Sequence, residues 1–282
     1  MKKTLNSEVL SLLSRMETED SPRGLKVVEE YLTTLEFDPL YPLMNFDSKA
    51  FNWKYFIGEL WWYLCEDTNI NRINEFSSFW KSLVDEFNRV NSNYGYIINS
   101  RQNKSQFKWA YDALINDKST RQAIMVFNTP AYQRQGVKDF VCTMYMNFWI
   151  RDNKLNMKVQ MRSNDIFYGL QYDAPFFSVV YQSMYLLLKE KYNELEVGTY
   201  YHCSDNTHYY ERHFSLVQEL RKENPNSNND IELKITKPIF DPNTGISIQA
   251  KRFNEHMESI EDFSVLKTQD YIDIFNKFFV EE

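Results

Sequence analysis

Three consecutive apolar runs of strand length, between residues 122 and 162, constrain the fold of this chain more than any other feature. They read QAIMVFN, FVCTMYMNFWI and KLNMKVQMR. β-Branched and aromatic residues are frequent in the first two, and such residues favour extended chain on a pleated surface. Arg151, Asp152 and Asn153 separate the last two runs and predict a hairpin turn. We therefore expect a β-sheet in the middle of the chain.

Helices are expected before this sheet, and helices alternate with strands after it. Apolar spacing of three and four predicts helices over residues 9–13, 27–35, 51–64 and 74–90. The second half is expected to contain a buried helix at 174–188, a strand at 199–203, a helix at 207–222 and a strand at 231–235. The Asn-rich loop at 224–230 leaves too little chain after it for a second core. This order predicts an α+β fold in one domain, residues 1–282.

Glycine is scarce, and its distribution excludes one class of phosphate site. Only seven glycines occur, and no two lie within ten residues of each other. Dinucleotide and nucleoside-triphosphate loops need clustered glycines, because the backbone must approach the phosphates closely. A bound phosphate would therefore be held by side chains. Arginine suits this best, since its planar fork makes two charge-assisted hydrogen bonds to phosphate.

The charge balance argues against polynucleotides and membranes as partners. The net charge of −7 and the pI near 5.3 give no field that attracts nucleic acid, and no run of five or six basic residues compensates locally. The N-terminal stretch mixes Asn, Ser and Glu into its apolar residues, unlike a secretion signal. The most apolar run, residues 140–150, is far shorter than the roughly 20 residues that cross a bilayer. We expect a cytoplasmic protein.

Cysteine and histidine spacing does not indicate a metal site. Three cysteines occur, Cys65, Cys142 and Cys203, without a CxxC pair. His202 and His208 lie six residues apart and lack a zinc-binding pattern. We therefore expect reduced thiols and no metal. Taken alone, Cys142 inside a predicted strand is most simply a small buried thiol.

A dense polar cluster twenty residues after Cys142 changes that interpretation. The segment MRSNDIFYGLQYD contains Arg162, Ser163, Asp165 and Asp173 among apolar residues. Polar groups this closely spaced are costly to bury unless a ligand uses them. An ion-pair network is the alternative explanation. The cluster therefore marks this segment as a candidate binding site.

Several segments now resemble the thymidylate synthase superfamily. Its members carry a nucleophilic cysteine followed by an R-S-x-D-x-F-x-G stretch, as residues 142 and 162–169 do here. Further similar segments are the glutamate-containing stretch at 59–69, the Tyr-Gly pair at 94–95, Ser-Thr-Arg at 119–121, and 202–210. The resemblance covers roughly residues 20 to 240. It implies a large mixed β-sheet flanked by helices and a homodimer formed through that sheet.

The resemblance also implies roles for individual residues. Cys142 would be the nucleophile that adds to carbon 6 of a pyrimidine, and Glu59 would organise water and proton transfer at the base. The residues implied in nucleotide binding are Arg23, Arg162, Ser163 and the partner subunit's Arg121 at the 5′-phosphate, His208 and Tyr210 at the sugar, and Tyr94 and Asn147. Those implied in folate binding are Lys49, Trp80 and Asp165. The co-substrate would be 5,10-methylenetetrahydrofolate.

The residue at the base-reading position argues for cytosine. Thymidylate synthases have an asparagine there, whose amide pairs with the edge of uracil, whereas this chain has Asp173. A carboxyl group accepts from the exocyclic amine of cytosine and shares a proton with the neighbouring ring nitrogen. Uracil carries an oxygen on carbon 4 in place of this amine, so two acceptor oxygens would face each other without a hydrogen bond. In this respect the segment resembles the phage deoxycytidylate hydroxymethylases, which convert dCMP to 5-hydroxymethyl-dCMP.

Two departures from the synthases bear on the product. Their W-x-x-W pair becomes Trp80 and Leu83, and their Cys-His becomes Cys142-Thr143. A looser pocket that admits water would favour hydroxymethylation over hydride transfer from the folate. The alternatives are a methyltransferase making 5-methyl-dCMP or dTMP, a relative acting on CMP, and a nucleotide-binding protein without turnover.

Overall fold

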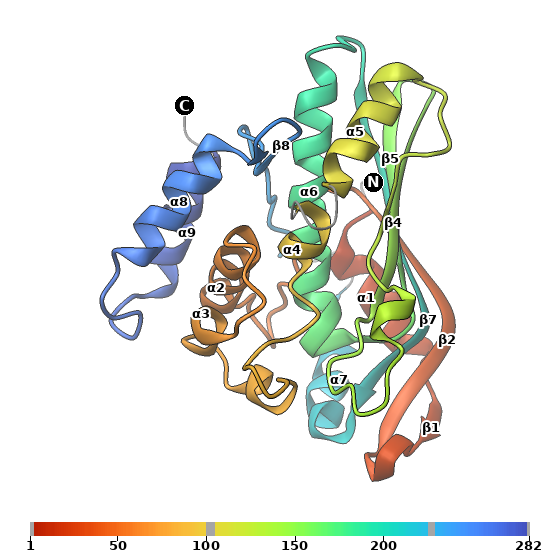
Figure 1. Ribbon diagram of the computed structural model, residues 1–282. Helices are drawn as coiled ribbons and strands as arrows, with labels where there is room; N and C mark the ends of the chain where they lie inside the picture. Colours follow the sequence, from red (N-terminus) through yellow and green to blue (C-terminus); the bar gives the residue numbers. More distant parts are fainter. Residues whose placement is uncertain (1–2, 100–104, 225–228, 281–282) are drawn as a thin grey trace.

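The computed structural model describes residues 3–99, 105–224 and 229–280 (Figure 1). Its α-helices are α1 (Leu5–Arg15), α2 (Trp53–Leu64), α3 (Asn71–Asn74), α4 (Tyr94–Asn99), α5 (Gln106–Asn116), α6 (Gln171–Lys189), α7 (Phe214–Leu220), α8 (Ile248–Glu258) and α9 (Thr268–Phe279). Its strands are β1 (Thr18–Asp20), β2 (Val27–Phe37), β3 (Ile124–Val126), β4 (Thr143–Arg151), β5 (Lys154–Met161), β6 (Asn164–Asp165), β7 (Glu196–Tyr210), β8 (Phe240–Asp241) and β9 (Gly245–Ile246).

One large mixed sheet organises the fold. Its strands follow the order β1-β2-β7-β5-β4-β3, and β6 pairs with β7 off this path. The pairs β5·β7 and β6·β7 are parallel, and the others are antiparallel. The predicted hairpin joins β4 to β5, where Asp152 and Asn153 have φ of 51° and 57°, as a tight hairpin turn requires. The prediction of an α+β fold with a large mixed sheet is confirmed.

Four secondary-structure predictions were wrong. Residues 27–35 form β2 instead of a helix, because they pair with residues 202–210 of β7 and their β-branched residues favour extended chain. Residues 207–210 extend β7, so only α7 remains of the predicted helix over 207–222. The segment 74–90 contains a 3₁₀ turn, Phe79–Ser82, in place of a long helix. Residues 231–235 form no strand, although Leu233 and Ile235 are buried.

The two faces of the sheet differ in how they are covered. Figure 1 shows the sheet nearly edge-on, with α2, α4 and α6 on one side of it. Side chains that point toward these helices are fully buried, such as Phe148 and Val159. The alternate positions, such as Tyr145, Trp149 and Lys158, are only partly buried. Among the described helices, none is long and apolar enough to cross a membrane.

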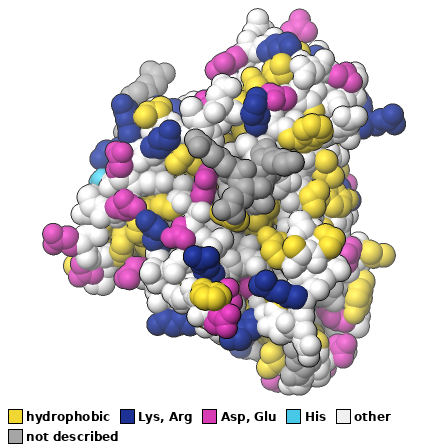
Figure 2. All heavy atoms as spheres, in the orientation of Figure 1, with side chains coloured by type: hydrophobic (Ala, Val, Ile, Leu, Met, Phe, Trp, Pro, Cys, Tyr) yellow, Lys and Arg dark blue, Asp and Glu magenta, His cyan; other side chains and the backbone are white. Residues whose placement is uncertain are grey.

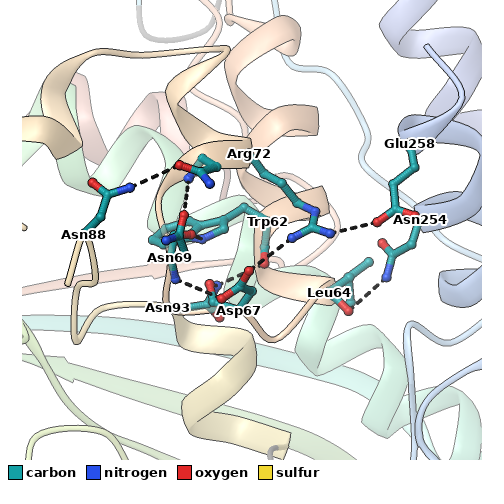
Figure 3. A network of polar contacts seen from close by, with 10 residues as sticks. Trp62, Leu64, Asp67, Asn69, Arg72, Asn88, Asn93, Asn254 and Glu258 are labelled. Atoms are coloured by element: carbon teal, nitrogen blue, oxygen red, sulfur yellow. Dashed lines mark hydrogen bonds and ion pairs between the residues drawn. The ribbon is translucent and has the colours of Figure 1, made fainter. Parts of the chain in front are cut away.

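A polar network holds the C-terminal end of α2 (Figure 3). The Trp62 indole donates to the Asn69 carbonyl at 2.9 Å. Asn93 Nδ2 donates to the Trp62 carbonyl at 2.9 Å, which ties α2 to the segment before α4. Arg72 bridges Asp67 on one side and a carboxylate of α8 on the other. This network fixes the position of α2, and with it the direction of Glu59.

Candidate active site

Cys142 and Arg162 are held together at one end of the sheet. Cys142 immediately precedes β4, and its carbonyl accepts from the Arg162 backbone N–H at 2.9 Å. The Arg162 guanidinium lies 3.4 Å from Cys142 Sγ and also donates to the carbonyls of Phe140 and Val141. Because these carbonyls fix the guanidinium, its positive charge stays beside the sulfur. A cation in this position favours the thiolate form of a cysteine.

Asp173 lies in the first turn of α6 and has a protein donor on one oxygen. Its Oδ2 accepts from Asn164 Nδ2 at 2.9 Å. Burial raises the pKa of Asp173 to about 6, although the hydrogen bond from Asn164 opposes this shift. Both its protonated and its ionised forms are therefore accessible near neutral pH.

Glu59 is a second buried carboxyl group, on α2. It is 6% exposed, and the Tyr55 hydroxyl donates to its Oε1 at 2.9 Å. Burial, and then the charge of Asp173, raise the pKa of Glu59 to about 8. Glu59 is thus mainly protonated at neutral pH. Two carboxyl groups with separated pKa values are a common arrangement for acid and base roles in one site.

Tyr55 connects Glu59 to Trp80, and sequence reasoning missed it. The Trp80 indole donates to the Tyr55 hydroxyl at 3.1 Å, while the same hydroxyl donates to Glu59. The only signal in the sequence is that Tyr55 precedes Glu59 by four residues on a helix, which places both on one face. The chain Trp80–Tyr55–Glu59 therefore links a proposed folate residue to a proposed proton-transfer residue.

Tyr94 lies near both Cys142 and Asp173. It is 5% exposed at the start of α4. Burial, followed by the charges of Asp173 and Cys142, raises the pKa of Tyr94 well above its ordinary value. Gly95 allows this helix to approach α2, since a Cβ there would lie 1.8 Å from the Tyr63 carbonyl oxygen. The close approach of α4 to α2 thus places Tyr94 near Cys142 and Asp173.

Asp165 and the end of β7 form the next part of the site. Asp165 Oδ1 accepts from the backbone N–H groups of Phe167 and Tyr168, at 2.7 and 3.0 Å. Its Oδ2 is buried with no hydrogen-bond partner among the described residues. In the parallel pairing of β6 with β7, Asp165 lies opposite His208, whose ring is 5.3 Å from that of Tyr210. An unpaired buried oxygen at this point fits a donor from a ligand.

Four more of the predicted residues lie in other parts of the structure or beside Arg162. Arg121 is exposed and precedes β3. The pairing of β3 with β4 places it beside the C-terminal end of β4, whereas Cys142 lies at the N-terminal end, about 25 Å away along β4. Asn147 lies on the sheet face away from the helices, and its Oδ1 is buried with no hydrogen-bond partner in the part of the chain that the structure describes. Lys49 precedes α2, and burial lowers its pKa. Ser163 is partly buried between Arg162 and β6.

Arg23 lies in a 3₁₀ turn, Pro22–Gly24, and its side chain lies outside what the structure describes.

Within the described ranges, no group of three or more His, Cys, Asp or Glu side chains is placed to hold a metal ion.

Comparison with known proteins gives matches over most of the chain. A sequence profile of the family described as thymidylate synthase matches residues 12–265. Deoxycytidylate 5-hydroxymethyltransferase of Enterobacteria phage T4 is 30% identical over 180 residues, 61% of this chain and 73% of the phage protein. Deoxyuridylate hydroxymethyltransferase of Bacillus phage SP01 is 22% identical over 273 residues, 90% of this chain and 70% of that protein. Thymidylate synthase of Corynebacterium aurimucosum is 26% identical over 241 residues, 82% of this chain and 87% of that enzyme.

The raised pKa of Glu59 predicts how stability depends on pH. The folded chain keeps this proton up to about pH 8, whereas an ordinary glutamate loses it near 4.5. The folded state thus binds more protons between these values, so the free energy of unfolding falls as pH rises. Between pH 6.5 and 8, the free energy of unfolding should fall by about 2 kcal/mol less in Glu59→Gln than in the wild type, as measured by urea unfolding. Glu75→Gln, at an exposed position, is the control, and an equal fall in wild type and Glu59→Gln would contradict the prediction.

Proposed function

Because this chain belongs to the thymidylate synthase family, whose members transfer one-carbon units to pyrimidine nucleotides, we propose that it is a deoxycytidylate 5-hydroxymethyltransferase. The reaction converts dCMP, 5,10-methylenetetrahydrofolate and water to 5-hydroxymethyl-dCMP and tetrahydrofolate. The proposed catalytic domain spans residues 1–282, in the cytoplasm. The similarity to the phage T4 enzyme supports this choice. The observation that carries it is a partly buried aspartate with a raised pKa, Asp173, at the expected base-reading position.

Asp173 supports cytosine as the base. Its pKa of about 6 allows it to hold or release a proton near neutrality. One oxygen can accept from the exocyclic amine while the other shares a proton with the adjacent ring nitrogen. A site built for one hydrogen-bonding edge rejects the wrong edge by on the order of 10⁴, because buried polar groups are left unpaired. The same proton stabilises the negative charge that develops on the ring.

Cys142 and Arg162 support the covalent step. The Cys142 thiolate adds to carbon 6 of the ring, and the electron pair this releases makes carbon 5 a nucleophile. Carbon 5 takes up the methylene group, then loses its proton as tetrahydrofolate leaves, which produces an exocyclic methylene. Water adds to that methylene, and the elimination of Cys142 restores the aromatic ring. Glu59, protonated at neutral pH, is proposed to organise the water and the proton transfers.

The described residues fit a folate co-substrate. Methylenetetrahydrofolate would supply the methylene group. The unpaired Oδ2 of Asp165 offers an acceptor for an N–H of its ring system. Trp80 is held by Tyr55 and is 7% exposed, and Lys49 carries a positive charge suited to a carboxylate. These three residues are therefore the proposed folate contacts.

The remaining nucleotide contacts are proposed from the family. Arg162 and Ser163, with Arg23, would hold the 5′-phosphate, and His208 and Tyr210 would contact the sugar. Tyr94 and Asn147 complete the proposed set. The fixed guanidinium of Arg162 supports the phosphate assignment.

A homodimer formed through the sheet is the proposed assembly. The sheet face away from α2, α4 and α6 carries partly buried aromatic rings, such as the stacked pair Trp149 and Tyr201 at 5.8 Å. Figure 2 shows charges of both signs interspersed on the face in view, with hydrophobic side chains toward the edge where the sheet lies in Figure 1. Arg121 is far from Cys142 in its own chain, so its proposed phosphate contact would be made in the partner subunit.

Methylation of the nucleotide is the second candidate, favoured by the similarity to a thymidylate synthase. The two products from dCMP differ by the mass of one oxygen atom, about 16 daltons, since water adds in one case and hydride in the other. Mass analysis of the product therefore separates the two candidates.

The nucleophile assignment predicts a complete loss of activity. With dCMP tritiated at carbon 5 and methylenetetrahydrofolate, the wild-type protein should release tritium, and Cys142→Ser should release none, because an alcohol is too weakly acidic to add to the ring. Cys65→Ser should retain release, since burial raises the pKa of the Cys65 thiol to about 12 and keeps it unreactive. Tritium release by Cys142→Ser would remove the assignment.

The base assignment predicts a change of substrate. Asp173→Asn replaces the carboxyl group with an amide that matches uracil, so the ratio of kcat/KM for dCMP to that for dUMP should fall by on the order of 10² or more. Steady-state kinetics with each nucleotide measures this ratio. Asp205→Asn, at an exposed position on β7, is the control and should keep the wild-type ratio. An unchanged ratio in Asp173→Asn would rule out the specificity argument.

The shared phosphate site predicts complementation between subunits. Arg121→Ala and Cys142→Ser should each be nearly inactive. In dimers formed from both variants, one of the two sites has its own Cys142 and the partner's Arg121, so co-expression should restore about a quarter of wild-type activity. Co-expression of Cys142→Ser with a second copy of itself is the control. No recovery in the mixed dimers would contradict the shared site.

A further inference from the structure

Three buried polar side chains form a continuous hydrogen-bonded line that ends at the partly buried Asp173. The Tyr200 hydroxyl lies 2.9 Å from His202 Nδ1, and His202 Nε2 lies 3.2 Å from Asn164 Oδ1. Asn164 Nδ2 then donates to Asp173 Oδ2 at 2.9 Å. Tyr200, His202 and Asn164 are 0%, 2% and 3% exposed. The line runs from β7 through β6 to α6.

The chemistry of the groups gives this line one direction. An ionised carboxylate only accepts, so the Asn164 amide turns its NH₂ toward Asp173 and its oxygen toward His202. His202 must then donate from Nε2. Burial lowers the pKa of His202 to about 3, so the ring is neutral and its Nδ1 accepts. Tyr200 supplies that hydrogen bond, because burial raises the pKa of its hydroxyl and keeps it protonated.

Gly169 shows that the last bond of the line is closely packed. A Cβ at this position would lie 2.7 Å from Asn164 Nδ2 and 3.1 Å from Asp173 Oδ2. The backbone of the turn Ile166–Leu170 therefore covers the hydrogen bond between the two side chains. Glycine at position 169 thus leaves room for the hydrogen bond between Asn164 and Asp173, and any larger residue there would press on it.

A carboxyl group that is free to place its proton would not distinguish the two bases. With the proton on the oxygen facing ring nitrogen N3, a carboxylic acid pairs with cytosine. With the proton on the oxygen facing position 4, the same acid donates to the uracil oxygen and accepts from the uracil N3–H. Specificity for cytosine therefore requires control of which oxygen carries the proton, in addition to the presence of an acid.

We propose that Asn164 is a specificity-determining positioning residue, which keeps Asp173 Oδ2 as an acceptor and confines any proton to Oδ1. Oδ2 then faces the exocyclic amine, through its second lone pair, and Oδ1 faces N3. Tyr200 and His202 act by fixing the direction of the Asn164 amide. This inference rests on the proposed function, because it assigns the source of the preference for dCMP.

The other titratable groups around Asp173 are protonated, so Asn164 is the residue proposed to determine which Asp173 oxygen carries the proton. The groups that face Asp173 are Glu59 and Tyr63 on α2, Tyr94 on α4 and Tyr200 on β7. Burial first, and the negative charge of Asp173 in addition, raise the pKa of each of them, so all four are mainly protonated near neutral pH. Among the residues that the structure describes, the side chain that donates a hydrogen bond to the Asp173 carboxyl group is Asn164.

The test compares Asn164→Leu with the wild-type protein for both nucleotides. Leucine is close to asparagine in size and makes no hydrogen bond, so the proton of Asp173 is no longer confined. The ratio of kcat/KM for dCMP to that for dUMP should fall at least about tenfold, through a gain for dUMP as well as a loss for dCMP. A purely structural role would lower both values by the same factor.

Two further variants complete the experiment. Tyr200→Phe removes the hydroxyl at the far end of the line, so His202 and the Asn164 amide are no longer held in one orientation. The ratio of kcat/KM for dCMP to that for dUMP should fall by a smaller factor than in Asn164→Leu. Thr207→Val, which changes a buried residue opposite Asn164 in the sheet, is the control and should keep the ratio. If Asn164→Leu does not fold, Tyr200→Phe decides alone.

The outcomes separate this inference from the proposed function. A wild-type protein that prefers dCMP, together with variants that keep its ratio, would overturn the role of Asn164 and leave the proposed function standing. A wild-type protein that does not use dCMP would overturn both. A lowered ratio in Asn164→Leu and Tyr200→Phe, with Thr207→Val unchanged, would support the inference.

Discussion

The hydrogen bond between Asn164 and Asp173 is the interaction on which the proposed chemistry depends. It joins β6, at the end of the sheet, to the first turn of α6, so it also sets how the helix layer meets the sheet. Burial of the Asp173 carboxyl group brings its pKa close to neutrality, which an exposed aspartate would not reach. An acid that can hold or release a proton is what a cytosine ring needs opposite N3.

The residues around Asn164 and Asp173 support different chemical roles in the proposed site. On one side, Arg162 keeps a positive charge beside Cys142 through bonds to backbone carbonyls. On the other, Glu59 stays mainly protonated because it is buried and faces a second acid. Like charges that are buried together resist ionisation, so the two carboxyl groups titrate at separate pH values. The arrangement supports a thiolate, a neutral acid and a base-reading acid in one site.

Local sequence signals predicted the parts of the protein in which neighbours along the chain decide the structure. The hairpin of β4 and β5 and the buried helix α6 follow from local apolar patterns and turn residues. The apolar residues of 27–35 fit a helix as well as a strand, and pairing with β7, more than 160 residues away, decides for the strand. The same limit applies to the site. The R-S-x-D motif indicated Arg162 and Asp165, but the partner of Asn164 on α6 becomes visible only in the fold.

The most direct test is a structure of the protein with dCMP bound. The account predicts Cys142 Sγ facing carbon 6 of the ring, Asp173 Oδ1 within hydrogen-bond distance of N3, and Asp173 Oδ2 within that distance of the exocyclic amine while still accepting from Asn164. A base bound with Asp173 out of reach, or with Cys142 turned away from the ring, would contradict it.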